Sequence, residues 1–167
     1  MDQFSFLETT AEISITFAGF VSIFVVLARR DGSFSPEFAL TIRSILMSSI
    51  TCLFSAALPL ILAALGVSGS PLWRLVSTGF LVTGCGIGFY MVSNRRRLPA
   101  AQQGTVFARI AWSLFALIML ALVANIAGWP LPPNAGAHLV SIWLLLGISS
   151  SNFLDLVFRG LLGGANG

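Results

Sequence analysis

The sequence predicts an all-α integral membrane protein, in which five transmembrane helices form a single transmembrane domain over residues 1–167. The first observation is composition: 56% of the residues are hydrophobic and only 9% are charged, whereas about a quarter are charged in a typical soluble domain. The second is that the apolar residues gather in five runs, each near the length of about 20 residues that a helix needs to cross a bilayer. Since backbone groups in lipid must pair within their own segment, these runs predict helices rather than strands.

The five spans are predicted, in chain order, at about residues 12–28, 38–65, 72–93, 106–127 and 137–158. The first apolar run is short, and its helix is expected to begin near Phe6. Ser35-Pro36 and Ser70-Pro71 each place a capping hydroxyl before a proline at the first helical position, which favours the starts of the second and third helices. Gly66 and Gly128 follow the second and fourth runs and are typical helix stops. The prolines after Gly128 predict a rigid loop before the fifth span.

The arginines predict how these spans are oriented. In a five-span arrangement one side of the membrane receives Arg74 alone, and the other side receives all the rest: Arg29, Arg30, Arg43, Arg95, Arg96, Arg97, Arg109 and Arg159. Because basic residues are enriched in cytoplasmic connections, the N-terminus is predicted outside and the C-terminus inside. Arg29, Arg30 and Arg95 to Arg97 are the residues on which this topology mainly depends.

Three of the predicted spans carry polar side chains at helical spacing, so that each set shares one face. These sets are Ser5, Glu8, Thr9, Glu12, Thr16 and Gly19 in the first span; Thr41, Ser44, Ser48, Thr51, Cys52, Ser55 and Pro59 in the second; and His138, Ser141, Ser149, Asn152, Asp155 and Arg159 in the fifth. Polar groups at membrane depth avoid lipid, so each face is expected to meet the bundle interior, a subunit interface or a water-filled cavity.

Six of these polar residues are the predicted lining of a pathway: Glu12, Thr16, Ser48, Ser55, Asn152 and Asp155. Carboxylates and hydroxyls are the groups that line ion and solute pathways. The alternative is structural, because serine and threonine often bond back to their own helix and carboxylates form ion pairs.

The third span is rich in glycine, and Gly79, Gly84, Gly86 and Gly88 are predicted to mediate helix packing. Gly84 and Gly88 form a GxxxG pair, which lets two helix backbones approach closely. Because the small residues occupy two faces, this helix is expected to pack on both sides.

The chain has few groups from which to build an active site. Its single histidine excludes two-histidine metal sites within one chain, and neither cysteine has metal-ligand spacing. The sequence contains no H-E-x-x-H, G-x-S-x-G or P-loop motif. We therefore expect no enzymatic activity, no resident metal and no cofactor.

The segment Ala11-Glu12-Ile13-Ser14-Ile15-Thr16-Phe17-Ala18-Gly19-Phe20 resembles the first helix of a group of short bacterial membrane proteins without an assigned function. The resemblance covers about ten residues. It implies a multi-pass protein of the bacterial inner (cytoplasmic) membrane whose first helix is important.

Two functions remain open at the level of sequence. One is a small channel or transporter subunit that works as a homo-oligomer and passes ions or small solutes along a polar-lined pathway, which is expected between subunits because five short spans leave little room for a pore within one chain. The other is a non-catalytic accessory subunit that docks other membrane proteins of a larger complex. The expected partners are the lipid bilayer, further copies of the chain and, for the accessory function, other membrane proteins. We expect no binding of nucleic acid, because the arginines are dispersed between apolar runs rather than gathered on one basic face.

Overall fold

The structure, a computed structural model, describes residues 3–28, 35–97 and 106–163, with the backbone alone at 27–28, 106–107 and 159–163. It consists of five α-helices: α1 (Gln3–Ala28), α2 (Pro36–Ala64), α3 (Gly69–Arg95), α4 (Val106–Ala127) and α5 (Ala135–Gly163). Each helix is long and apolar enough to cross a membrane, which confirms the predicted all-helical fold of a multi-pass membrane protein. No strand occurs in the described ranges.

The bounds of the helices differ from the predicted spans mainly at their ends. The fourth helix covers the predicted 106–127, whereas the first begins at Gln3 and the fifth continues to Gly163. The hydropathy of the first span falls before Glu12, but its helix continues through the polar residues, where Thr9 and Thr10 bond to the carbonyls of Ser5 and Phe6. Hydropathy thus located the apolar part of each helix and not its polar ends.

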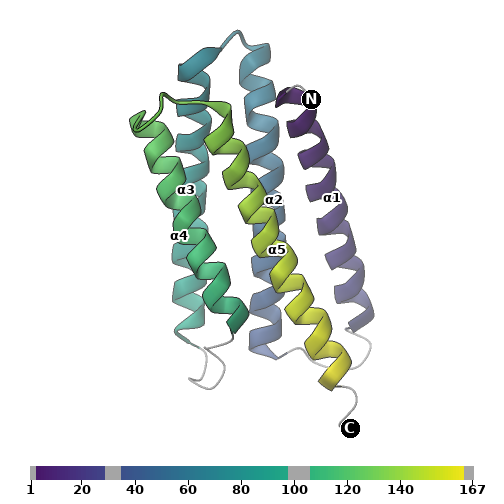
Figure 1. Ribbon diagram of the computed structural model, residues 1–167. Helices are drawn as coiled ribbons and strands as arrows, with labels where there is room; N and C mark the ends of the chain where they lie inside the picture. Colours follow the sequence, from purple (N-terminus) through teal and green to yellow (C-terminus); the bar gives the residue numbers. More distant parts are fainter. Residues whose placement is uncertain (1–2, 29–34, 98–105, 164–167) are drawn as a thin grey trace.

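The helices alternate in direction between two ends of an elongated bundle (Figure 1). We call the end where α1 begins the amino-terminal end and the end where α5 finishes the carboxyl-terminal end. Helices α2, α3, α4 and α5 form a closed ring in which each packs against two neighbours, and α1 packs outside this ring, mainly on α2. The termini therefore lie at opposite ends of the bundle.

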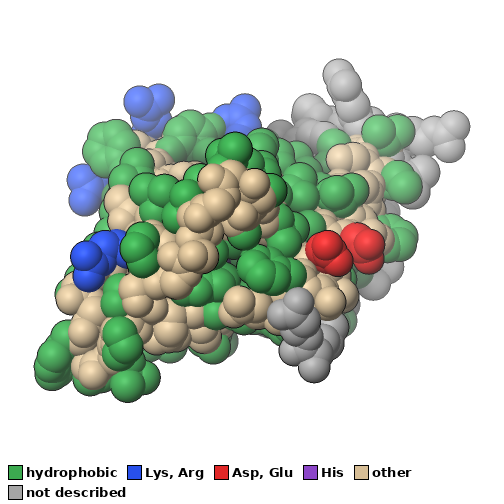
Figure 2. All heavy atoms as spheres, turned by 90° about the horizontal axis from the view of Figure 1, so that it is seen from above, with side chains coloured by type: hydrophobic (Ala, Val, Ile, Leu, Met, Phe, Trp, Pro, Cys, Tyr) green, Lys and Arg blue, Asp and Glu red, His purple; other side chains and the backbone are tan. Residues whose placement is uncertain are grey.

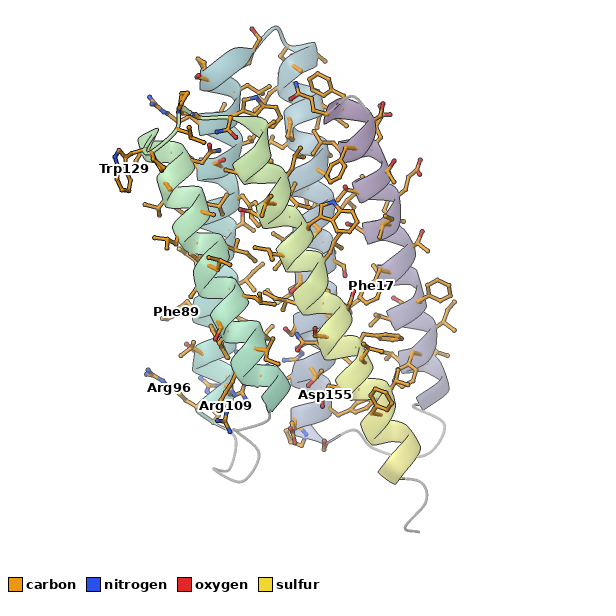
Figure 3. All side chains as sticks on the ribbon, in the orientation of Figure 1. Phe17, Phe89, Arg96, Arg109, Trp129 and Asp155 are labelled. Carbon is orange, nitrogen blue, oxygen red and sulfur yellow. The ribbon has the colours of Figure 1, made fainter. Side chains whose placement is uncertain are left out.

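Apolar side chains fill the amino-terminal half of the four-helix ring. The buried members of this core are Leu7, Cys52, Ala56, Leu72, Trp73, Val76, Phe80, Ile118, Leu122, Ile142, Leu145, Leu146 and Ile148. A second apolar cluster joins α1 to α2 and α5 toward the carboxyl-terminal end. There the rings of Phe17, labelled in Figure 3, and Phe153 pack edge to face with their centroids 5.4 Å apart. Burial of these side chains is what sets the positions of the helices relative to one another.

Two caps define where helices start. Ser35 accepts a hydrogen bond from the backbone N–H of Phe38 at 3.2 Å and precedes Pro36, as predicted for α2. The third helix begins earlier than predicted, because Ser68 rather than Ser70 is the residue in extended conformation before it. Gly69, with φ of +66°, then makes the turn into α3, a conformation that glycine adopts without steric cost.

Asn125 holds the connection between α4 and α5. Its side-chain amide donates to the hydroxyl of Ser77 at 2.9 Å and exchanges two hydrogen bonds with the backbone of Asn134, at 3.2 and 3.0 Å. The side chain of Asn134 in turn accepts from the N–H of Ala137 in the first turn of α5. One buried amide therefore joins α3, α4 and the start of α5.

A proline in α2 is matched by a histidine in α5. Pro59 lacks a backbone N–H, so the carbonyl of Ser55, four residues earlier, has no helical donor. His138 is fully buried, and its Nε2 lies 3.0 Å from that carbonyl oxygen. Since a carbonyl only accepts, Nε2 carries the proton. Among the described atoms, Nδ1 of His138 has no hydrogen-bond partner.

The arginines with described side chains are distributed unequally between the two ends. Arg43, Arg95, Arg96, Arg97 and Arg109 lie toward the carboxyl-terminal end, whereas Arg74 lies near the amino-terminal end. Arg29 and Arg30 fall outside the described residues. The asymmetry from which the orientation was predicted is therefore present in the fold, and the orientation itself stays a prediction.

Candidate functional site

A cavity of about 130 Å³ lies inside the four-helix ring. It begins at the carboxyl-terminal end, where Glu37 and Arg95 stand at the ends of α2 and α3, and it reaches the middle of the bundle at Thr51 and Phe80. On α2 the lining runs from Glu37 to Thr51, a rise of about 21 Å along the helix. All four helices of the ring contribute to the lining, and α1 does not. The cavity therefore belongs to a single chain rather than to an interface between chains.

The wall formed by α2 is polar. Thr41, Ser44, Ser48 and Thr51 follow Glu37 along this wall at alternating steps of three and four residues, so they share one face. Three of the hydroxyls donate to carbonyls of their own helix, at 3.1 Å for Thr41, 2.8 Å for Ser48 and 2.7 Å for Thr51. Because these protons are engaged, the hydroxyls offer lone pairs to the cavity. Such a wall suits water, cations and hydrogen-bond donors.

The wall formed by α3 and α4 is apolar and depends on small residues. A Cβ atom at Gly84 would stand 2.6 Å from Cε of Met119, and one at Gly88 would stand 3.0 Å from the ring of Phe115. These two glycines thus let α3 and α4 approach closely, as predicted for the GxxxG pair. The rings of Phe80, Trp112 and Phe115 and the aliphatic chains of Ile87, Met91, Ile118 and Met119 complete this wall.

The mouth of the cavity is charged. Glu37, Arg95 and Asp155 all line it, from α2, α3 and α5. Arg96 and Arg109 lie at the same end of the bundle as Asp155, as Figure 3 shows. A solute that enters from this end therefore meets two carboxylates and a guanidinium before it reaches the hydroxyls.

The inner end of the cavity is closed by apolar side chains. Phe80, Ile118 and Leu145 lie at this inner end of the lining, beside Met119, and these three also belong to the buried apolar core. Trp73 and Leu122 continue that core away from the cavity. The cavity thus crosses about half of the bundle and ends at a layer of apolar side chains.

Three of the six predicted lining residues meet in this cavity. Ser48, Asn152 and Asp155 line it, and the amide of Asn152 donates to the hydroxyl of Ser44 at 3.3 Å, which ties α5 to α2 beside the cavity. Ser55 is buried but lies deeper than the lining, within the apolar half, where its carbonyl accepts from His138. The polar faces of the second and fifth spans therefore turn inward, as predicted.

The polar face of the first span does not turn inward. Glu12 and Thr16 are exposed, as are the other members of that set, Ser5, Glu8, Thr9 and Gly19. The reason is that α1 uses its opposite face, with Leu7 and Val21, to pack against the ring. Within one chain Glu12 and Thr16 therefore do not line the bundle interior, and that they line a pathway between subunits stays a prediction.

The four predicted packing glycines divide in the same way. Gly84 and Gly88 are buried against α4, and a Cβ atom at Gly79 would stand 3.5 Å from the side chain of Leu58 on α2, an ordinary packing distance. Gly86 is exposed, and a Cβ atom there would meet nothing within 4 Å. The prediction that this glycine packs against another helix of the same chain is wrong.

Several residues of the site were not predicted. Glu37 and Trp112 were not singled out in the sequence, and Arg95 was interpreted only as a topology signal. Glu37 lies four residues before Thr41, so the hydroxyl face of α2 pointed to it. The partners across the cavity depend on which helices are neighbours, which helical spacing does not contain.

No known family model, curated protein or solved structure matches the chain. The resemblance of the first span to short bacterial membrane proteins therefore stays a prediction. In the part of the chain with described side chains, no three His, Cys, Asp or Glu residues gather to hold a metal ion.

Proposed function

We propose that the protein is a channel or transporter subunit that passes ions or small solutes through the α2–α5 ring. We further propose that it does so in the bacterial inner membrane, with the amino-terminal end of the bundle outside, and without catalysing a reaction. The observation that carries the proposal is the cavity, because the polar, lone-pair-rich wall of α2 faces a cavity inside an apolar bundle. Intramembrane polar groups that face a cavity are typical of solute pathways.

The form of the cavity supports a pathway in a closed state. Its lining extends from the carboxyl-terminal end to the middle of the bundle, and the apolar side chains of Phe80, Ile118 and Leu145 stand between it and the other end. Hydrophobic constrictions of this kind gate pathways by excluding water. Conduction then requires these side chains to move apart, or the helices that carry them to tilt.

Two measurements test the proposal. The first is water access: in a chain in which Cys52 and Cys85 are replaced by alanine, Ser48→Cys should react with a charged thiol reagent added from the side of the carboxyl-terminal end. Ser55→Cys, which lies within the apolar half, should react much more slowly. Equal protection of the two positions would mean that the cavity is not entered from water.

The second measurement is flux in liposomes that contain the purified protein. Ser48→Leu fills the cavity and should lower the flux of small ions or solutes by at least roughly tenfold, whereas Ser113→Leu, on the exposed face of α4, should leave it unchanged. An absence of flux for any ion or small solute tested would overturn the proposal and favour the accessory-subunit alternative.

A further inference from the structure

The exposed polar face of α1 is unusual for a membrane helix. With 26 residues, α1 is about 39 Å long, whereas the hydrocarbon core is about 30 Å thick. When the helix is centred, Glu12 stands roughly 9 Å inside the hydrocarbon boundary. A carboxylate that faces acyl chains at this depth is costly. The face therefore requires a cover that the single chain does not supply.

The outward face of α3 carries complementary groups. Arg74 and Thr78 are exposed near its start, and Val82, Cys85 and Phe89 continue the same face toward its end. Arg74 is the arginine nearest the amino-terminal end among those described. When α3 is centred in the same way, Arg74 stands only about 2 Å inside the hydrocarbon boundary, where its guanidinium can pair with an acidic side chain of a neighbouring helix.

The two faces can be aligned so that their charges meet. Helices α1 and α3 run in the same direction from the same end of the bundle (Figure 1). A contact that brings their first residues level pairs residues whose numbers differ by 66: Glu8 with Arg74, Glu12 with Thr78, Thr16 with Val82, Gly19 with Cys85, and Ile23 with Phe89. In this alignment charge meets opposite charge and the second carboxylate meets a hydroxyl. Thr16, whose hydroxyl already donates to its own helix, meets an apolar side chain.

Small residues allow close approach in the middle of such a contact. Gly19 on α1 and Gly86 on α3 are both exposed, and a Cβ atom at either would meet nothing within 4 Å. Gly86 stands beside Cys85, which is level with Gly19. Helix pairs in membranes associate through such small residues, because they bring the backbones together.

The two faces cannot meet within one chain. α1 packs against α2 from outside the ring, and α3 packs against α2 and α4 within it. Seen from the amino-terminal end, acidic side chains lie at one edge of the molecule and basic side chains at the opposite edge (Figure 2). We propose that the protein assembles head to tail, with the outward face of α1 in one copy packed in parallel and in register against the outward face of α3 in the next.

Such a contact is heterologous, because each copy contributes two different faces. It therefore forms a ring where the rotation between copies closes, and an open row where it does not. The inference does not depend on the cavity, which lies within one chain and is not lined by α1. Assembly and flux can therefore be lost independently.

Disulfide cross-linking in native membranes tests the contact. In a chain that carries Cys52→Ala and Cys85→Ser, Thr16→Cys and Val82→Cys are introduced together and an oxidant is added. We expect a reducible ladder of dimers, trimers and larger species, because every copy can bond to two neighbours. The matched control carries Thr16→Cys together with Leu117→Cys, on the exposed face of α4, in place of Val82→Cys. It should give no ladder.

Three outcomes would overturn the proposal. One is dimers from Thr16→Cys alone, which would mean that α1 meets α1. Another is a cross-link from Thr16→Cys to a chain of different mass, which would mean that a foreign membrane protein covers this face. The last is the absence of any cross-link specific to the Thr16→Cys and Val82→Cys pair.

Charge reversal provides a second test that depends on the same contact. Arg74→Glu should weaken assembly of the purified protein by about tenfold or more in dissociation constant, measured by light scattering in detergent. Glu8→Arg combined with Arg74→Glu should restore it. Arg96→Glu, an exposed arginine at the other end of the bundle, is the control and should have no effect. Helix content by circular dichroism should be equal in all variants, because these side chains are exposed. Failure of the double charge reversal to restore assembly would contradict the pairing of Glu8 with Arg74.

Discussion

The hydrogen bond between His138 and Ser55 gives the sharpest prediction for the stability of the bundle. Pro59 deprives the Ser55 carbonyl of its helical donor, and Nε2 of His138 replaces that donor at 3.0 Å. In His138→Leu the carbonyl remains buried without a partner, which costs about 1–3 kcal/mol. Leucine fills a similar volume, so little of this cost comes from a cavity. The substitution also removes the buried Nδ1, which has no hydrogen-bond partner among the described atoms, and this removal offsets part of the cost of the unpaired carbonyl.

A double-mutant cycle separates these terms. In Pro59→Ala the new N–H at position 59 restores the helical bond to Ser55, so the carbonyl no longer depends on the histidine. We expect His138→Leu to cost about 1–2 kcal/mol less in the Pro59→Ala background than in the natural chain, since only coupled groups deviate from additivity. The change in packing and the removal of Nδ1 occur in both backgrounds and cancel.

The cycle is measured by reversible unfolding in mixed detergent micelles, with helix content as the signal. All four proteins should fold, because each keeps the apolar core. An equal cost of His138→Leu in both backgrounds would refute the reasoning, because it would mean that the bond to Ser55 does not depend on the proline.

Two further predictions concern the packing of the other helices. Asn125→Ala removes the side-chain oxygen that accepts from the backbone N–H of Asn134 at 3.0 Å. This change should lower the free energy of unfolding, measured in the same micelles, by about 2–3 kcal/mol. An unchanged unfolding curve would contradict the role of this amide as a link between helices. Gly88→Ala places a Cβ atom 3.0 Å from the ring of Phe115 and should lower the free energy of unfolding by about 1–3 kcal/mol. Gly86→Ala, with open space around the new Cβ atom, should leave the unfolding of single chains unchanged. Equal effects of the two substitutions would show that α3 and α4 are not in close contact.

Much of the fold follows from the hydropathy of the sequence. Five runs of apolar residues predict five helices, and the fourth is found at the predicted residues. The ends were less well predicted, because Gln3 to Ala11 and the residues after Phe158 are less apolar yet remain helical. A polar residue near the end of a span does not break a helix, since its backbone can still pair within the segment.

Two of the three predicted polar faces turn inward within one chain, and the third, on α1, turns outward. Helical spacing shows that Glu12 and Thr16 share a face, just as it does for Ser48 and Thr51, but it does not show what that face meets. The second and fifth faces turn inward because the two helices pack together in the ring. The first turns outward because Leu7 and Val21 on its other side supply the packing.

The closed layer in the middle of the bundle has an electrical consequence. When water fills the cavity, mobile ions hold its interior near the potential of the adjoining solution. A voltage across the membrane then falls mainly over the apolar half, at and beyond Phe80, Ile118 and Leu145. In the proposed function, each elementary charge that crosses this half therefore gains almost the full electrical energy, about 2.3 kcal/mol for 100 mV, over half the length of the bundle.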